Sequence, residues 1–354
     1  MANIHDVARE AGVSIATVSR VLNGTAQVGA KAAERVRLAA QRLEYRPNSA
    51  ARALRVSRTK IIGLLITDIQ NPFFTALVRG VEDVAQREGY SLILCNSDED
   101  PQKERHYVEV LCAEQVAGAI LVPTRERQRA GHLFRDHHIP VVAVDRRIDD
   151  RFIDAVLVDN VCGARNAVTH LIANGYRRIG VVTGPQNTTT GRERLEGYRE
   201  ALYAGGIAPD STLERIGSFK NETGKRLTGK LLDLTPPIDA LFVTNNVMAL
   251  GALEALHTRG LRIPGDVAVV VFDEMPWASI GVVSLTTVRQ PVYDLGSTAA
   301  IRLFERLHES NELARQEIIL QSTLCIRGSS TPVQRGLPVE QPSLVHRRAR
   351  HVSF

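Results

Sequence analysis

Polar side chains follow several of the apolar, β-branched runs in this sequence, and they could bind a small molecule that carries hydroxyl groups. Asp145 and Asp273 each come directly after such a run, and Phe73 and Phe74 follow shortly after another. Carboxylates accept hydrogen bonds from hydroxyls, while an aromatic ring can stack on the apolar face of a sugar. None of these residues forms a nucleophile with an oriented base, so the pattern favours binding over catalysis.

Apolar runs alternate with amphipathic helical stretches from residue 61 onward. Strands that are apolar throughout are typical of parallel sheets covered on both faces, and ligands bind outside the carboxyl ends of such strands. We therefore predict an α/β fold whose body has two lobes, each with a doubly wound parallel sheet, and a change of sheet near Asp159 and Asn160. No glycine-rich phosphate loop follows the first run, which excludes the usual nucleotide enzymes. The predicted strands are Ile61–Ile66, Ser91–Cys95, Ala119–Val122, Val141–Val144, Ile179–Val182, Ala240–Val243 and Val267–Phe272.

Residues 4–23 contain two short helical patterns separated by Gly12 and Val13. Capping residues stand at both helix starts, Asn3 with Asp6 and Ser14 with Thr17. This is the layout of a helix-turn-helix, in which the second helix enters the major groove of DNA, although an ordinary helical hairpin has the same pattern. The residues we expect at the DNA are Ser14, Ile15, Ala16, Thr17, Ser19, Arg20 and Asn23.

Charge is distributed as DNA binding requires. Residues 1–60 hold eleven Lys and Arg against four Asp and Glu, whereas residues 61–330 hold 29 against 34. A basic segment next to an acidic body fits phosphate contact by one end of the molecule.

A third helix is predicted from about Ala30 to Leu43, and a short helical segment follows near residue 50. Two turns are unstable alone, so this segment needs a partner. Arg52 and Arg55 with Leu54 fit a wedge in the minor groove, while the alternative is a simple linker.

Other features narrow the class of protein. The 354 residues contain no apolar stretch long enough to cross a bilayer, and the amino end looks like a helix start rather than an export signal. We therefore expect no membrane partner and a cytoplasmic protein. Cys95, Cys112, Cys162 and Cys325 are widely spaced, so we expect free thiols, no metal site and no cofactor.

The head carries a specific resemblance. Asp-Val-Ala-x-x-Ala-Gly-Val-Ser-x-x-Thr-Val-Ser-Arg-Val-Leu-Asn-Gly, followed by Tyr-x-Pro-Asn-x-x-Ala-Arg-x-Leu, resembles the lac/galactose repressor family of bacterial transcription factors, and the likeness continues to about Ser330. The resemblance implies a ligand-controlled repressor that binds a near-palindromic operator as a homodimer, with a body like the periplasmic binding proteins. Ile15, Ala16 and Arg20 then fall on base-reading positions, and Leu54 falls on the hinge. Gly29 departs from the serine that usually caps the third helix.

The resemblance also implies an effector site between the lobes, for a monosaccharide or a sugar acid. Thr188 stands where a purine-binding relative has arginine. Asn246 departs from the usual aspartate. Arg194 and Asp273 are expected to face each other across a sugar-sized gap, and one of the two adjacent phenylalanines is expected in the core. The implied effector residues are Phe73, Phe74, Thr124, Arg146, Asn160, Thr190, Arg194, Phe219, Asn246 and Asp273.

The expected domains follow from these patterns. Residues 1–46 form the DNA-binding domain and 47–60 the hinge. The body spans 61–330, with lobe one at about 61–160 and 290–321 and lobe two at about 161–289 and 322–330. Residues 331–354 are a basic tail that we expect to be disordered, with no leucine heptad for tetramer formation.

Two other classes of protein share parts of this pattern. A solute-binding receptor has the two-lobed body but requires an export signal and lacks the basic head. An enzyme with a regulatory head requires a catalytic pair in the cleft, which a screen for turnover of sugars would reveal.

Overall fold

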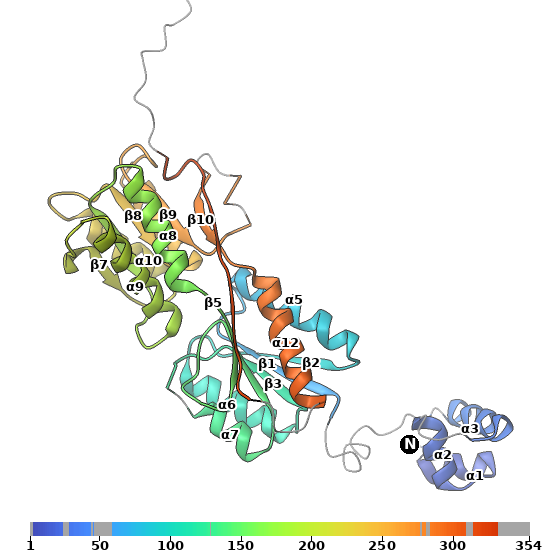
Figure 1. The fold of residues 1–354 in the computed structure, drawn as a ribbon. Coiled ribbons are helices and arrows are strands. Elements are labelled where there is room, and N and C mark those ends of the chain that lie inside the picture. Colours follow the sequence, from blue (N-terminus) through green and yellow to red (C-terminus); the bar gives the residue numbers. More distant parts are fainter. Residues whose placement is uncertain are drawn as a thin grey trace, which may run out of the picture.

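The fold is that of a computed structural model of the chain (Figure 1). The structure describes residues 3–23, 28–43, 45, 59–127, 129–276, 278–280, 284–308 and 314–331. It contains a helical head and a body of two α/β lobes, as the sequence predicts. No helix in these ranges is long and apolar enough to cross a membrane.

The head has three helices, α1 (Ile4–Ala11), α2 (Ile15–Asn23) and α3 (Ala30–Arg42). A reciprocal capping box between Asn3 and Asp6 starts α1, and the Ser14 hydroxyl accepts from the Thr17 N–H at the start of α2. Gly12 ends α1 with φ 60°, a left-handed conformation that suits glycine. Gly29 gives α3 no side-chain cap. The buried core of this domain comprises Val7, Ala8, Ala11, Val18, Val36, Ala39 and Ala40.

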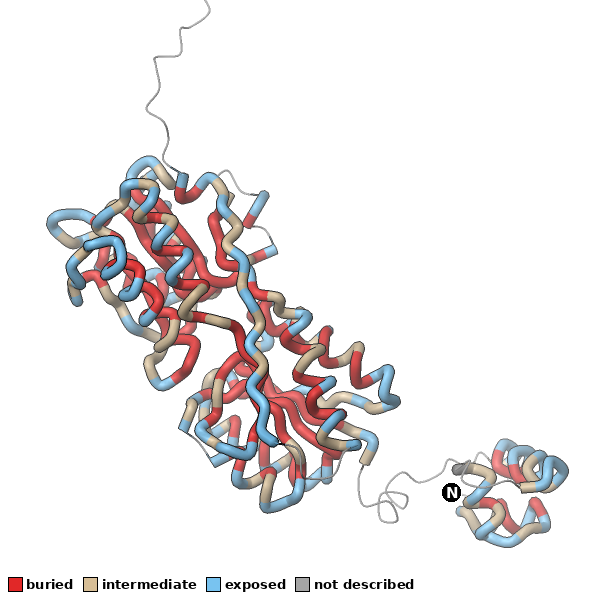
Figure 2. The backbone as a smooth tube through the Cα atoms, viewed as in Figure 1, coloured by how far each residue is buried: buried red, intermediate tan, exposed pale blue. Residues whose placement is uncertain are grey.

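Lobe one is built on a parallel six-stranded sheet in the order β11-β5-β4-β3-β1-β2. Helices α5 (Pro72–Arg87) and α12 (Val292–His308) cover one face, and α6 (Pro101–Ala113) and α7 (Ala130–Asp136) cover the other. Figure 2 shows the buried sheet between these helices. The strands are β1 (Ile61–Ile66), β2 (Ser91–Asn96), β3 (Gly118–Leu121), β4 (Val141–Val144), β5 (Asp154–Val158) and β11 (Glu317–Leu320).

Lobe two repeats this plan in the order β12-β10-β9-β8-β6-β7, with β12 antiparallel to β10 and the other pairs parallel. Helices α8 (Asn160–Ala173) and α9 (Thr189–Ala204) cover one face, and α10 (Asn221–Leu232) and α11 (Asn246–Thr258) cover the other. A short 3-10 helix, Ser211–Leu213, precedes β7. The strands are β6 (Ile179–Thr183), β7 (Glu214–Ile216), β8 (Ala240–Val243), β9 (Ala268–Phe272), β10 (Thr286–Arg289) and β12 (Thr323–Cys325).

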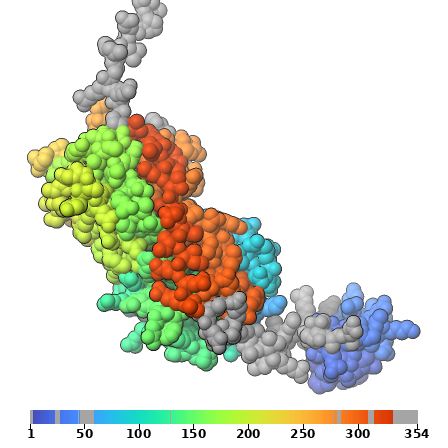
Figure 3. All heavy atoms as spheres, viewed as in Figure 1, coloured from blue at the N-terminus to red at the C-terminus, as the bar shows by residue number. Residues whose placement is uncertain are grey.

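The chain passes between the lobes three times. The crossings lie at Asp159, at 290–291 and at 321–322, each between an element of one lobe and the next element in the other. Figure 3 shows the last crossing as a red segment on the surface of both lobes.

All seven predicted strands are present, within one residue at each end. The sequence pattern missed five others, β5, β7, β10, β11 and β12. Four of these have only three or four residues, and β7, β11 and β12 lie at sheet edges, where exposed positions interrupt the apolar run.

Candidate functional site

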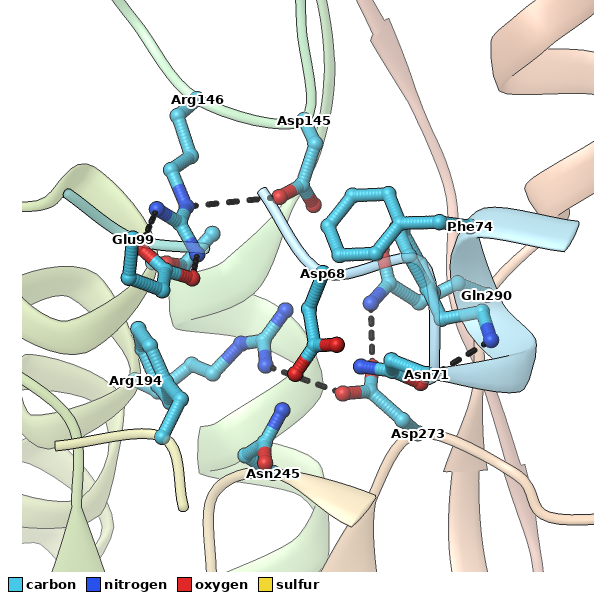
Figure 4. Close-up of a pocket in the computed structure, with 13 residues that line it drawn as sticks. Asp68, Asn71, Phe74, Glu99, Asp145, Arg146, Arg194, Asn245, Asp273 and Gln290 are labelled. Atoms are coloured by element: carbon cyan, nitrogen blue, oxygen red, sulfur yellow. Dashed lines mark hydrogen bonds and ion pairs between the residues drawn. The ribbon is translucent and has the colours of Figure 1, made fainter. Parts of the chain in front are cut away.

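A narrow pocket lies between the lobes, where the carboxyl ends of strands from both sheets meet (Figure 4), and it occupies about 380 Å³ including its open mouth. Both lobes contribute side chains to it, as the doubly wound topology predicts. The lining residues are Asp68, Asn71, Phe73, Phe74, Glu99, Asp145, Arg146, Thr190, Arg194, Phe219, Asn245, Asp273 and Gln290.

The first turn of α5 supplies the aromatic wall. Asn71 caps this helix by accepting from the Phe73 N–H at 3.0 Å, and Pro72 occupies the first helical position. Phe73 and Phe74 are 7% and 3% exposed, and their rings meet edge to face with centroids 5.1 Å apart. The sequence favoured one of them as core and the other as pocket. In the structure both belong to the lobe-one core, and both line the pocket.

Arg194 and Asp273 lie in direct contact rather than across a gap, which corrects the expectation from sequence. The Arg194 Nη1 is 3.4 Å from the Asp273 Oδ2, because both residues belong to lobe two. The guanidinium also donates to Asn160 Oδ1 at 2.9 Å and to the Thr244 carbonyl at 2.8 Å, and it stacks 3.8 Å from the centre of the Phe272 ring. Arg194 is thus held in one orientation before any ligand arrives.

Gln290 and Thr190 carry hydrogen-bonding capacity that the described residues do not use. The Gln290 amide donates to Asp273 Oδ1, while its Oε1 is buried without a partner. The Thr190 hydroxyl is likewise buried and unpartnered. Buried polar atoms are normally hydrogen-bonded, so these two mark places where a ligand hydroxyl would be accepted.

Lobe one contributes an ion pair beside the aromatic wall. Arg146 donates to both Glu99 oxygens at 2.7 and 2.8 Å, and its guanidinium lies 5.2 Å from the centre of the Phe219 ring. Burial raises the pKa of Asp145 to about 6. Glu104, behind this pair, accepts from the Thr124 N–H at 2.6 Å, and burial raises its pKa to about 7.

The lobes also contact each other around the pocket. The contacts that join them include Asn246 Nδ2 to Asn71 Oδ1 at 2.8 Å, Lys220 to Asp68 at 3.4 Å, Arg192 to Glu126 at 2.6 Å, the Arg147 N–H to Thr189 Oγ1 at 3.1 Å, and Arg147 to Glu193. The structure therefore holds the lobes closed on the pocket.

Comparison with known proteins decides the family. Residues 59–325 match the family described as periplasmic binding proteins and sugar binding domain of LacI family. Residues 3–48 match bacterial regulatory proteins, lacI family. The chain belongs to the LacI family. It is therefore a DNA-binding transcriptional regulator and not an enzyme.

Relatives and solved structures agree with this assignment. The ribose operon repressor of Halalkalibacterium halodurans is 40% identical over 313 residues, which cover 87% of this chain and 91% of that relative. The lac repressor dimer bound to operator and the anti-inducer ONPF superposes with a TM-score of 0.82 at 28% identity, over 94% of this chain and 99% of that one. A LacI-family regulator from Enterococcus faecium with bound ribose superposes with a TM-score of 0.69 at 29% identity, over 77% of this chain and 100% of that one.

The structure of this LacI-family chain places seven of the ten expected effector residues on the pocket lining. Three do not line it. Thr124 lies behind Arg146 with its N–H on Glu104, Asn160 holds Arg194 and Glu193, and Asn246 turns to Asn71. Asn245 lines the pocket in place of Asn246. Asn160 and Asn246 thus contact residues of the lining and not the cavity.

Six lining residues were not among the ten that the family resemblance implies. Asp68, Asn71, Asp145 and Asn245 follow the carboxyl ends of strands, where polar residues were expected to form the cleft. Glu99 lies in the loop after β2. Gln290 directly follows β10, a strand that the sequence pattern missed.

The DNA-binding residues are partly described. On α2 the side chains of Ile15, Ala16 and Arg20 are exposed, and those of Thr17 and Ser19 are half-buried, beside exposed Ser14. This is the face expected to read DNA. The side chain of Asn23, and Arg52, Leu54 and Arg55 of the hinge, lie outside the described residues.

Proposed function

We propose that this LacI-family regulator is a repressor that binds operator DNA as a homodimer and is controlled by a neutral pentose of the ribose type. It acts in the cytoplasm, where its DNA is found. The observation that carries the choice of ligand is the pocket between the lobes, in which aromatic rings face a set of charged and amide groups fixed by hydrogen bonds.

Three aromatic rings favour a sugar. Phe73 and Phe74 form one side of the pocket and Phe219 another, so a flat ring can stack while its hydroxyls point to the polar groups. The unpartnered Gln290 Oε1 and Thr190 Oγ1 offer acceptors to those hydroxyls. The relatives named above include a ribose operon repressor and a regulator with bound ribose.

Charge favours a neutral sugar over a sugar acid. Four carboxylates line the pocket, from Asp68, Glu99, Asp145 and Asp273, against two guanidiniums, from Arg146 and Arg194. An anionic ligand would bring a further negative charge into this buried group at an electrostatic cost.

A purine effector fits the pocket less well. Relatives of this chain include the repressor PurR of Pasteurella multocida, at 35% identity over 332 residues. In this chain Thr188 is buried as the cap of α9, where its hydroxyl donates to the Pro185 carbonyl and accepts from the Gly191 N–H. That position therefore supplies no cation to a base.

The head supplies the DNA contact in this proposal. Arg20 reads a base edge from α2, Ile15 and Ala16 read methyl groups or shape, and Leu54 of the hinge wedges the minor groove. Ligand binding between the lobes changes the angle between them and thereby the spacing of the two heads.

The test measures operator binding by the full chain with and without D-ribose. We expect saturable ribose binding by calorimetry and at least a tenfold change in operator affinity at saturation. Arg20→Ala should lose operator affinity while binding ribose normally. If neither ribose nor another neutral pentose bound, the choice of ligand would be wrong. If the wild type did not distinguish operator from random DNA, the regulatory function itself would be refuted.

A further inference from the structure

A second cavity lies at the amino ends of the lobe-one strands. The pocket between the lobes, which we call the effector pocket, lies at the carboxyl ends of the same strands. It occupies about 1200 Å³ including its open mouth, next to the amino ends of β4, β5 and β11. We call it the basal pocket, and its polar and aromatic lining comprises Arg135, His138, Arg151, Phe152, Arg306 and Arg315.

Among the residues that the structure describes, the lining of the basal pocket includes four arginines and no carboxylate. Acidic residues stand behind two of the arginines, Arg135 and Arg306. Asp150 accepts from Arg135 at 3.0 and 2.9 Å, and its side chain is 5% exposed against 36% for the arginine. The guanidinium is therefore anchored from the protein side and keeps an exposed side toward the cavity.

The same arrangement recurs at the end of α12. Asp154 is buried and accepts from Arg306 at 2.7 and 2.8 Å, and Arg306 also donates to the Ala314 carbonyl at 3.0 Å. Arg315 donates through Nε to the Ile153 carbonyl at 2.9 Å. Arg135 and Arg315 are each fixed through part of their donor set, which lowers the entropy lost when their other donors bind a ligand.

Arg151 completes the wall and is not neutralised. Within the described part of the chain its only recorded contact is with the exposed ring of Phe152, whose centre lies 4.8 Å from the guanidinium. Arg135 contacts the same ring at 4.9 Å. Two guanidiniums on one aromatic ring present their donors within one concave surface, and planar donor forks of this kind match phosphate oxygens.

We propose that the basal pocket binds the phosphate group of a small phosphorylated metabolite, as a ligand site separate from the effector pocket. The concave shape favours a small molecule over the backbone of duplex DNA. The four arginines, with no carboxylate among the described lining residues, favour an anion over a neutral sugar. The site lies within one lobe, so its occupation does not require the lobes to close.

The experiment titrates inorganic phosphate and ribose 5-phosphate into the full-length protein by calorimetry, with ribose present at saturation to occupy the effector pocket. We expect saturable binding of at least one phosphate compound. Arg151→Glu should weaken it at least tenfold, because a cation that faces the cavity is replaced by an anion. Arg151 has no ion pair with a described residue, so the variant should fold, which thermal melting checks.

Two controls make the result specific. Arg226→Glu changes the charge of an exposed arginine on α10 in lobe two and should leave phosphate binding unchanged. Asp273→Ala impairs the effector pocket and should also leave it unchanged. Equal losses in Arg151→Glu and Arg226→Glu, or no saturable binding by the wild type, would overturn the proposal. It would also be overturned if Arg151→Glu weakened only the binding of long operator fragments, since the surface would then contact DNA.

Discussion

The two ends of the lobe-one strands carry pockets of opposite chemistry. At the carboxyl ends, Asp145 and Glu99 line the same cavity as Arg146, the arginine with which they pair. At the amino ends of the strands, Asp150 pairs with Arg135 and Asp154 with Arg306, and of these four residues only the two arginines line the cavity. The same kind of ion pair therefore suits a neutral ligand or an anion, depending on which partner faces the cavity.

The largest expected effect is a loss of ribose affinity in the effector pocket. Asp273→Ala removes the group that holds both Gln290 and Arg194, and it leaves a buried guanidinium without its carboxylate. We expect ribose affinity to fall by about 100-fold or more, as is typical when one partner of a buried charge pair is lost. Calorimetry measures it. Asp233→Ala, in an exposed pair with Arg259, should bind ribose as the wild type does. Unchanged affinity in both variants would show that ribose does not bind between the lobes.

The next effect tests charge discrimination. Ribonate, the acid of the same sugar, should bind the effector pocket at least about tenfold more weakly than ribose, because four carboxylates surround the ligand. Competition calorimetry against ribose measures the ratio. Equal affinity for ribose and ribonate would mean that the lining carboxylates are neutralised. The effector pocket would then not differ from the basal pocket in its preference for a neutral ligand.

Glu104 and Asp154 sharpen the comparison through pH. Burial raises the pKa of Glu104 to about 7. Burial also acts to raise the pKa of Asp154, but hydrogen bonds from Arg306, the Gln316 N–H and Arg302 bring it below the ordinary value. The folded protein thus binds a proton at Glu104 that the unfolded chain releases between about pH 4.5 and 7, so this residue adds stability as the pH falls through that window. The stability that Asp154 adds is present above pH 3.8 and is lost as the pH falls through its lower folded-state pKa.

Glu104→Gln should therefore stabilise the protein at pH 8, by on the order of 1 kcal/mol, and should remove this contribution between pH 7 and 5. Urea unfolding at pH 5, 6, 7 and 8 measures the effect. The matched variant Glu88→Gln changes an exposed glutamate and should follow the wild type. A loss of stability at pH 8 in Glu104→Gln would show that the ionised carboxylate is needed there.

The smallest effect concerns closure of the lobes, which binding in the effector pocket requires and binding in the basal pocket does not. Glu126→Gln weakens the pair with Arg192 across the rim, and the two side chains are 27% and 43% exposed. Partly exposed pairs contribute up to about 1 kcal/mol, so we expect ribose affinity to fall about two- to fourfold. Glu254→Gln, in a pair with Lys225 inside lobe two, is the control. A loss of phosphate binding in Glu126→Gln would contradict the independence of the basal pocket.

Sequence patterns located most of the architecture because the strands are apolar and the helix caps are local. Ser14 and Asn3 cap the helices that they were expected to start. The site was harder to predict at the level of single residues. Of the neighbours Asn245 and Asn246, the first caps α11 and lines the pocket, while the second turns to Asn71. Which neighbour faces a cavity depends on helix geometry that spacing does not encode.

The basal pocket could not have been predicted from the sequence. Arg135, Arg151 and Arg315 come from separate segments, and nothing in their spacing distinguishes them from other surface arginines. Asp150 holds Arg135, the Ile153 carbonyl holds Arg315, and the Phe152 ring contacts Arg151, and only the folded lobe brings these partners together. Gln290 was missed for another reason, since it directly follows β10, a strand that the sequence pattern did not predict.

The three crossings between the lobes have a mechanical consequence. A single connecting segment would let one lobe twist, slide or bend against the other. Three neighbouring segments oppose twisting and sliding, so bending is the motion that costs least energy. Gln290 lies within one crossing and is hydrogen-bonded to Asp273. A ligand there acts on one coordinate, an opening angle, whose effect grows with distance from the axis. A small rotation at the pocket therefore produces a larger displacement at the far end of lobe one, where β1 begins.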